Sequence, residues 1–186
     1  MRLFIAIEIP DEIRGTLESF LAEMRGIAPQ VKWARASNLH VTLKFLGNTD
    51  AAKIGQIESA LKSIRCSQPV PLEFRSLGFF PSEKRPRVFW AGMTSSTNLP
   101  LLAADIDRAM HQLGFPLEAR PFTPHLTLAR FDPPGLPPKL GAAVKQRTSA
   151  NFGSLTAREF HLIESKLKST GAEYTTLQSF PFVAEN

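Results

Sequence analysis

The sequence predicts an α+β fold built from two related halves with antiparallel sheets. The pattern His-x-Thr-Leu occurs at 40–43 and again at 125–128, 85 residues later (125 − 40). At the same offset Phe4 aligns with Phe89. Each half shows the order strand, helix, histidine strand, helix, strand, without a strict βαβ rhythm. This order favours α+β, and the repeat indicates an internal duplication.

The first half begins with an expected strand at 3–9, which is apolar, rich in branched residues and ended by Pro10. Apolar residues then recur at helical spacing from Ile13 to Met24, and Gly26 marks the end of this helix. The other elements expected in this half are a short strand at 31–33, the first histidine strand at 38–46, a helix at 54–64 capped by Asp50, a strand at 70–80 and a charged loop at 81–87.

The second half repeats this order. A strand at 88–91 precedes a helix whose apolar face runs from Leu102 to Leu113 and which ends at Gly114. Residues 132–138 are predicted to form a loop, because prolines this dense fit neither a sheet ladder nor a helix interior. The other expected elements are the second histidine strand at 122–131, a short helix at 139–147 and two strands at 155–165 and 174–182.

Length and composition are those of a globular protein with one well-buried core. The chain has 186 residues, of which 43% are hydrophobic and 21% charged. We therefore expect a single domain over 1–186, made of two pseudo-symmetric lobes that carry the His40 and His125 motifs. Cys66 is the only cysteine, which excludes an internal disulfide and leaves Cys66 without an expected function. With no signal peptide in 1–10 and no apolar run of membrane length, we expect a cytoplasmic protein that does not bind membranes.

The charge balance points mildly toward an anionic partner. The formal net charge is +5, which suits a nucleotide or RNA. No block of five or more consecutive lysines and arginines is present, so a tight duplex-DNA binder is not expected.

Each histidine strand is predicted to have one polar and one apolar face. Because side chains alternate along a strand, His40, Thr42 and Lys44 should share one face, and His125 and Thr127 should share the equivalent face. Pseudo-twofold packing would then place the two strands side by side across a cleft, with two imidazoles and two hydroxyls together. The residues expected to face the core are Val41, Leu43, Phe45, Leu126 and Leu128.

We considered three explanations of the His-x-Thr motifs other than an acid–base site. A single His-x-Thr is usually an outward-facing part of a half-buried strand, but two copies at matching positions are not readily explained in this way. A zinc site is not predicted, because neither motif has an acidic residue at i+2 or i+4 and threonine is a poor zinc ligand. A serine hydrolase is disfavoured by the absence of a Gly-x-Ser-x-Gly motif.

Two facing histidines suit the opening of a cyclic phosphodiester by water. The in-line displacement needs a base for the water proton and an acid for the leaving oxygen, on opposite sides of phosphorus. Imidazoles with pKa near 6.5 can be one neutral and one protonated near pH 7. Thr42 and Thr127 could each donate a hydrogen bond to a non-bridging phosphate oxygen. This chemistry requires no metal and no cofactor.

The chain resembles the 2H phosphoesterase superfamily, named for its paired His-x-Thr/Ser motifs. Within it, the chain is most similar to the RNA 2′,3′-cyclic phosphodiesterases, also called 2′-5′ RNA ligases, of the LigT or ThpR group. The resemblance spans nearly the whole chain and is carried by 2–7, 38–47, 87–92, 121–130, 164–165 and 171–174.

The resemblance implies a duplicated, bilobal fold with two antiparallel sheets around a central cleft and helices outside. It also implies a role in RNA processing, by hydrolysis of an RNA or nucleotide 2′,3′-cyclic phosphate to a 2′-phosphomonoester. By family convention His40 donates a proton to the leaving oxygen and His125 accepts the proton of water. The expected partner is RNA with a cyclic phosphate end or a small cyclic nucleotide; no protein partner is predicted, and we expect a monomer.

Several residues and functions remain open alternatives. Arg130, which is usual in the family, and Lys44 could bind substrate; Arg130 should face away from His125 unless the strand bends or ends, and either residue could equally be a solvated surface cation. The same site could join RNA ends in the reverse reaction, or the protein could only bind nucleotides or RNA. The aromatic residues Trp33, Phe80, Trp90 and Phe122 could stack a base, although core packing is favoured for each.

Overall fold

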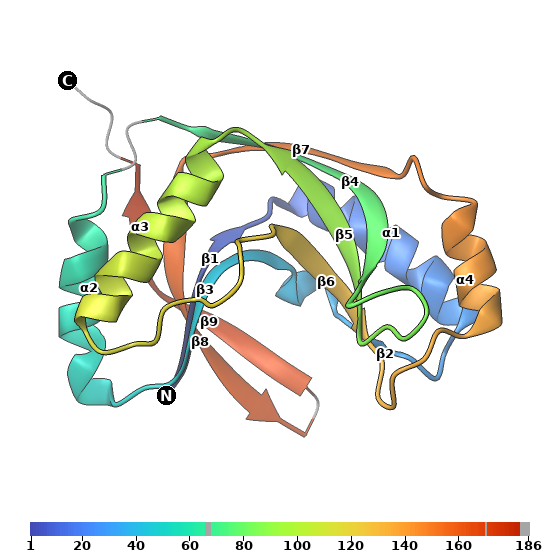
Figure 1. The fold of residues 1–186 in the computed structure, drawn as a ribbon, viewed down its shortest axis with the longest axis horizontal. Coiled ribbons are helices and arrows are strands. Elements are labelled where there is room, and N and C mark those ends of the chain that lie inside the picture. Colours follow the sequence, from blue (N-terminus) through green and yellow to red (C-terminus); the bar gives the residue numbers. More distant parts are fainter. Residues whose placement is uncertain (66–67, 170, 183–186) are drawn as a thin grey trace.

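The computed structural model describes residues 1–65, 68–169 and 171–182, and Cys66 lies outside them. Within these residues the chain forms two antiparallel sheets, with four α-helices on the outside (Figure 1), which confirms the expected α+β class. The four-stranded sheet contains, in spatial order, β3 (His40–Asn48), β1 (Arg2–Glu8), β8 (Glu159–Lys168) and β9 (Gly171–Pro181). The five-stranded sheet contains β2 (Lys32–Trp33), β6 (His125–Arg130), β5 (Val88–Ser95), β4 (Val70–Phe80) and β7 (Asn151–Ala157).

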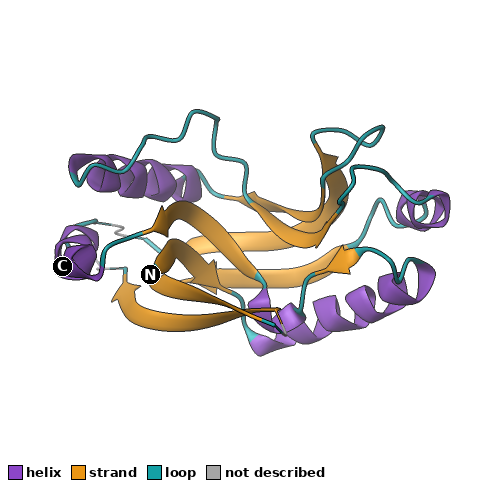
Figure 2. Ribbon diagram, turned by 90° about the horizontal axis from the view of Figure 1, so that it is seen from below, coloured by secondary structure: helices purple, strands orange, loops and turns teal. Residues whose placement is uncertain are grey.

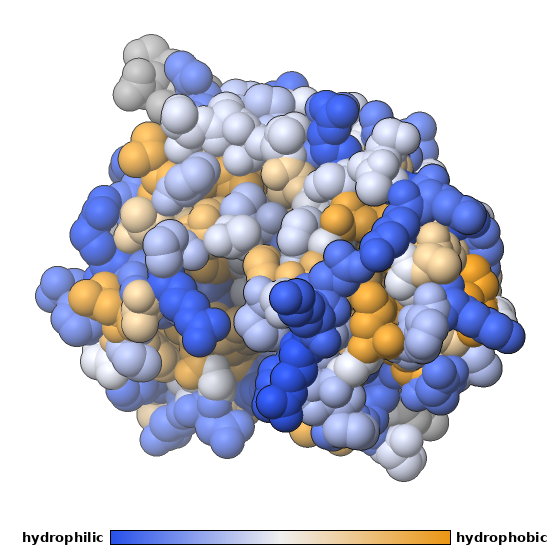
Figure 3. All heavy atoms as spheres, turned by 45° about the vertical axis from the view of Figure 1, so that its right-hand side comes forward, coloured by the Kyte–Doolittle hydropathy of each residue, from blue (hydrophilic) through white to orange (hydrophobic). Residues whose placement is uncertain are grey.

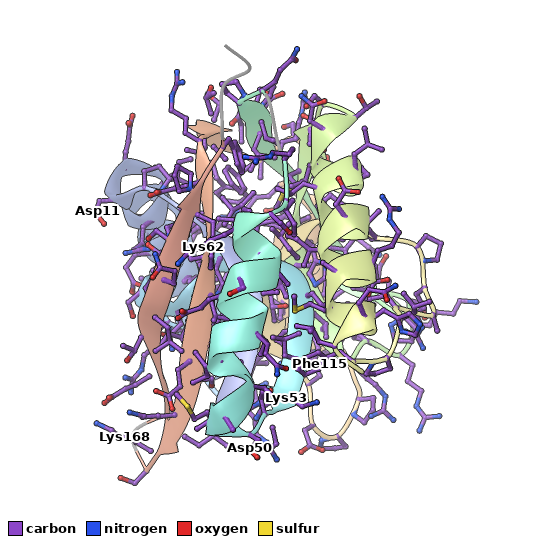
Figure 4. All side chains as sticks on the ribbon, turned by 90° about the vertical axis from the view of Figure 1, so that its left-hand side faces the viewer. Asp11, Asp50, Lys53, Lys62, Phe115 and Lys168 are labelled. Carbon is purple, nitrogen blue, oxygen red and sulfur yellow. The ribbon has the colours of Figure 1, made fainter. Side chains whose placement is uncertain are left out.

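The helices cover the outer faces of the two sheets. They are α1 (Asp11–Ile27), α2 (Ile54–Lys62), α3 (Asn98–Gln112) and α4 (Pro138–Lys145), and two 3-10 turns are η1 (Ala36–Asn38) and η2 (Ala51–Lys53). α2 and α3 lie together against the four-stranded sheet, whereas α1 and α4 lie on the side of the five-stranded sheet (Figures 1 and 2). Figure 4 shows the α2–α3 pair from outside, with Lys53 beside Phe115; the ammonium lies 5.4 Å from the ring centroid.

The two sheets are not the two halves of the sequence. β4 belongs to the first half but pairs with β5 and β7, and β8 and β9 from the second half complete the four-stranded sheet. The helices cross over as well: α1 follows β1 yet contacts β7, and α3 follows β5 yet contacts β3. Each sheet therefore requires both halves of the chain.

The four-stranded sheet buries apolar side chains on both faces. Leu3, Ile5 and Ile7 of β1 point into the main core, which also receives the apolar faces of all four helices. Phe4 and Ala6 point the other way and form a second small cluster with Ile163. This second face is the one on which the first histidine motif lies.

The strand expected at 155–165 is the main error in the predicted elements. The structure has two strands there, β7 and β8, which end and begin on either side of Arg158 and belong to different sheets. The first part of β7 looks like a loop in sequence because it is polar and contains Gly153, whose φ of +113° favours glycine. The pairing of β7 with β4 is a non-local interaction that the local pattern does not reveal.

Large apolar side chains are exposed at a few positions of the described surface. Figure 3 shows strongly hydrophilic side chains beside a recessed area with an apolar floor. Among the described residues the large apolar side chains that are exposed are Met1, Phe45, Leu101, Leu117, Leu167 and Tyr174. Only Phe45 and Tyr174 in this set are aromatic.

None of the helices in the described segments is long and apolar enough to cross a bilayer.

Candidate active site

A bulge in β3 changes the faces on which its side chains lie. Ile5 of β1 is opposite Lys44, but the next residue, Ala6, is opposite Thr42, so Leu43 is an extra residue in β3. An extra residue reverses the alternation of side chains beyond it. His40 and Thr42 are therefore on one face, as expected, but Lys44 is not.

The expectation that Lys44 shares the face of His40 is wrong. Lys44 is only 2% exposed, and its Nζ donates hydrogen bonds to Asp107 Oδ1 of α3 at 2.5 Å and to the Pro116 carbonyl at 2.9 Å. The bulge turns this side chain toward the core, where a lysine needs such partners to remain charged. Lys44 thus ties β3 to α3 and is not available to substrate.

Phe45 makes the opposite change. It was expected in the core, but the reversed alternation places it on the face of His40, where its side chain is 57% exposed. Its ring centroid lies 6.0 Å from that of Phe4, a member of the small cluster on this face.

β6 contains the same bulge at the equivalent position. Phe89 of β5 is opposite Ala129, and the next residue, Trp90, is opposite Thr127, so Leu128 is the extra residue. Burial follows the same order in both strands: the histidine and threonine are half-buried, and the two residues after the threonine are buried.

The bulge in β6 accounts for the position of Arg130. Strict alternation would turn Arg130 away from His125, but the extra residue restores it to the face of Thr127, and it is exposed. Its charge acts on Tyr174 of β9, where it and Arg2 oppose the rise in the phenol pKa that burial produces. Arg130 of one sheet therefore lies close to a residue of the other.

His40 is enclosed by aromatic rings and fixed by a backbone hydrogen bond. Its ring centroid is 4.6 Å from that of Phe4 and 5.2 Å from that of Tyr174, and its Nδ1 is 2.8 Å from the Asn38 carbonyl oxygen. Burial lowers the pKa of His40 from 6.5 to about 4, and the Asn38 carbonyl and the charge of Glu8 act in the opposite direction. His40 is therefore neutral near pH 7 when the site is empty.

His125 has the same anchor in a different setting. Its Nδ1 is 2.8 Å from the carbonyl oxygen of Thr123, which again is two residues earlier. The edge of its ring meets Phe80 at a centroid distance of 5.1 Å. A carbonyl oxygen can only accept, so Nδ1 carries the hydrogen in both histidines and Nε2 is left for proton transfer.

The two motifs are near each other, and their hydroxyls are free. β3 and β6 belong to different sheets, yet residues of these strands approach within 8 Å at Cα. Within the described part of the chain neither Thr42 nor Thr127 uses its hydroxyl in a hydrogen bond. The arrangement supplies two Nε2 atoms and two hydroxyls without competing partners.

Four residues at this site were not predicted from sequence as members of it. Arg2, Glu8, Phe45 and Tyr174 surround His40 or one another across β1, β3 and β9. Tyr174 is the only tyrosine of the chain, and this was the one sequence feature that could have marked any of the four as a site residue. The others depend on strand pairing and on the bulge.

The four aromatic residues weighed as base-stacking candidates are mostly engaged in packing. Trp33 packs against Phe89 and donates its indole hydrogen to the Ala28 carbonyl. Trp90 packs against Phe80, which in turn contacts His125. Phe122 packs against the main core.

A surface hollow of about 750 Å³ lies elsewhere, between α1 and the segment 33–37, and includes neither histidine. Two of its arginines are already paired, Arg14 with Asp11 and Arg25 with Glu18. Across residues 1–65, 68–169 and 171–182, no group of three or more His, Cys, Asp or Glu side chains could hold a metal ion. The motif strands therefore remain the candidate site.

Comparisons with known proteins identify the family of the chain. The family model described as LigT like Phosphoesterase matches residues 7–90 and 94–174. An RNA 2′,3′-cyclic phosphodiesterase of Archaeoglobus fulgidus is 34% identical over 180 residues, covering 97% of this chain and 99% of the relative. One from Methanocaldococcus jannaschii is 33% identical over 182 residues, covering 97% and 100%.

Solved structures show the same fold. The protein TT0787 of Thermus thermophilus aligns with a TM-score of 0.82 and 29% identity, over 100% of both chains. E. coli LigT complexed with 3′-AMP aligns with a TM-score of 0.75 and 29% identity, over 97% of both chains. The resemblance seen in the sequence is confirmed, and the chain belongs to the LigT-like phosphoesterase family.

Proposed function

We propose that the protein hydrolyses 2′,3′-cyclic phosphates at RNA ends or in small nucleotides to 2′-phosphomonoesters, with two imidazoles as the acid and the base and without a metal. The matched anchoring of His40 and His125 carries this proposal. Each Nδ1 is held 2.8 Å from a carbonyl two residues earlier, which leaves each Nε2 free. The curated relatives bear the name of this activity.

The proposed reaction is an in-line displacement at phosphorus. His125 Nε2 removes a proton from water, the water oxygen bonds to phosphorus, and the bond from phosphorus to O3′ breaks. O3′ takes a proton from His40 Nε2, so the product carries a 2′-phosphate and a 3′-hydroxyl. Thr42 and Thr127 donate hydrogen bonds to the non-bridging oxygens, and the Arg130 guanidinium offsets the charge that develops there.

This role requires His40 to gain a proton when substrate binds. Raising its pKa from about 4 to near 7 takes about 4 kcal/mol of favourable interaction with the protonated form. A phosphate anion about 4 Å away, at an effective dielectric constant of about 20, supplies about 4 kcal/mol. The cyclic phosphate can therefore create the acid that its own cleavage needs.

One domain over 1–186 is part of the proposal. Its two lobes would be the two sheets, each carrying one motif, held together because each takes strands from both halves of the chain.

Adenosine 2′,3′-cyclic phosphate in the presence of EDTA tests the proposal, with the 2′- and 3′-monophosphates separated by chromatography. We expect adenosine 2′-phosphate alone, and its loss in His125→Ala. The matched control is His111→Ala, which removes an exposed histidine of α3 outside both motifs and should leave the rate unchanged. No turnover by the wild type, a 3′-phosphate product, or full activity in His125→Ala would refute the proposal.

A further inference from the structure

We infer that the Ser76 hydroxyl holds the attacking water beside His125, by accepting the hydrogen that this water does not give to the imidazole. The inference rests on the proposed function, in which His125 is the base, and it adds a catalytic residue from outside both histidine motifs. Its basis is the glycine opposite His125, the backbone conformation of Ser76 and the atoms that surround this glycine.

The residues opposite the two histidines in the adjoining strands differ. Glu8 of β1 is opposite His40, whereas Gly92 of β5 is opposite His125. Directly opposite side chains in a sheet lie on the same face, about 4.5–5.5 Å apart at Cβ. A side chain at position 92 would therefore lie beside His125, and glycine leaves this space to other groups.

Ser76 reaches this space from the other side of β5. β4, β5 and β6 are neighbours in the five-stranded sheet (Figure 1), and β4 has a bulge in which Arg75 and Ser76 together oppose Gly92. A Cβ on Gly92 would lie 2.6 Å from Ser76 Oγ and 3.1 Å from the Arg75 carbonyl oxygen. The Ser76 hydroxyl is thus on the face of His125.

The backbone of Ser76 adopts a conformation that is unusual for a serine. Its φ is +67°, and among the described residues no other residue except glycine has a positive φ. Its N–H donates a hydrogen bond to the Ala150 carbonyl at 3.0 Å, which ties it to the segment before β7. Such conformations cost stability and concentrate at functional sites. Within the described segments the Ser76 hydroxyl makes no hydrogen bond, so its oxygen is free to accept one.

The space over Gly92 has the size and polarity that suit one water molecule. A group at the position of a Gly92 Cβ is within hydrogen-bond distance of two oxygens that can accept, Ser76 Oγ and the Arg75 carbonyl. The Cβ of His125 is about 5 Å from the same position, which allows the imidazole to reach a water there. Water has two hydrogens, one for Nε2 and one for an oxygen acceptor.

The proposed step uses these two hydrogens differently. The water oxygen bonds to phosphorus, and one proton passes to His125 Nε2. The other proton stays on this oxygen, becomes the P–OH hydrogen of the product, and donates to Ser76 Oγ during the attack. This hydrogen bond orients the water toward phosphorus before the reaction. Methanol has only one hydroxyl hydrogen, which His125 would take, so methanol has none left for Ser76.

The test compares these two nucleophiles. In buffer containing methanol, adenosine 2′,3′-cyclic phosphate yields adenosine 2′-phosphate by hydrolysis and the methyl diester by methanolysis, and chromatography separates the two products. We expect Ser76→Ala to slow hydrolysis about fivefold, within the range of one hydrogen bond, and to leave methanolysis unchanged. The control Ser154→Ala removes an exposed hydroxyl from β7 of the same sheet and should alter neither reaction.

A second variant separates catalysis from folding. Glycine adopts a positive φ readily, so Ser76→Gly should unfold at a urea concentration no lower than the wild type, yet should change the product ratio as Ser76→Ala does. An equal loss of both reactions in Ser76→Ala, or a loss of neither, would overturn the inference.

A failure of the proposed function would look different. The wild type would then form neither product, and the water site would be refuted together with the proposed function. If the wild type forms both products in a ratio that neither variant of Ser76 changes, only the water site would be refuted.

Discussion

The His40 and His125 strands share one plan and differ in their surroundings. Both place a histidine and a threonine before a bulge, and both hold Nδ1 at 2.8 Å from the carbonyl two residues earlier. The residues at the bulge then diverge. β3 continues with a buried lysine and an exposed phenylalanine, and β6 with a buried alanine and an exposed arginine.

The two strands thus share the geometry around each Nδ1 and differ in the side chains beyond the bulge. The proposed mechanism accounts for the shared anchors and bulge, because it requires each histidine to present Nε2 in a fixed tautomer with its threonine on the same face. The divergent residues make the surroundings aromatic beside His40 and cationic beside His125. The enclosure of His40 by Phe4 and Tyr174 lowers its pKa to about 4.

Removing either imidazole should have the largest effect and should show whether the two are distinct. His40→Ala and His125→Ala should each lower kcat for a cyclic nucleotide by about 10²–10⁴-fold, as expected for the loss of a general acid or base. With thymidine 5′-p-nitrophenyl phosphate, whose leaving group needs no proton, His40→Ala should recover much of its rate and His125→Ala should not. If steady-state assays showed the reverse pattern, His125 would be the proton donor and His40 the base.

Replacing Lys44 should affect stability and not substrate binding. Lys44→Met leaves Asp107, which is 18% exposed, without its charged partner, and should cost about 3 kcal/mol in the free energy of unfolding measured in urea. KM for the cyclic nucleotide should not change. Lys32→Met, at an exposed pair with Asp132, should cost less than about 1 kcal/mol. A large rise in KM for Lys44→Met would contradict this and indicate that Lys44 contributes to substrate binding.

The positions of Lys44 and Arg130 show which features of the site can be predicted from sequence and which cannot. Periodicity located the helices and most of the strands, and the repeat identified the histidines and threonines that the structure brings to neighbouring strands. Neither periodicity nor the repeat could reveal the bulges, because an extra residue is recognised only when a strand is aligned with its pairing partner. Two errors follow from this: Lys44 and Phe45 were each assigned to the wrong face of β3.

The assignment of strands to sheets was beyond the sequence for a similar reason. The segment 155–165 is divided between two sheets by pairings with β4 and β1, which lie far away in the chain. The residues around His40 other than its own motif come from β1 and β9, so they became visible only with the sheet order.

The lowered pKa of the half-buried His40 should make stability depend on pH. The folded pKa of about 4 lies below the 6.5 of the unfolded chain, so between these values the unfolded state binds more protons and stability rises with pH. This contribution is complete above about pH 6.5, and about 3 kcal/mol is lost as the pH falls to about 4. His40→Asn should flatten this part of the urea unfolding profile, and His111→Asn should not.

The smallest expected effect concerns the residues that anchor the two histidines. The Asn38 side chain donates a hydrogen bond to the Ala172 carbonyl at 2.8 Å and so joins the anchor of His40 to β9, the strand of Tyr174. Thr123, the equivalent anchor, makes only a local contact with the Pro121 carbonyl at 3.4 Å. Asn38→Ala should therefore cost about 1 kcal/mol of unfolding free energy and raise KM for the cyclic nucleotide, whereas Thr123→Ala should do neither measurably. Equal effects in urea unfolding and steady-state kinetics would mean that the link between η1 and β9 does not distinguish the two halves of the site.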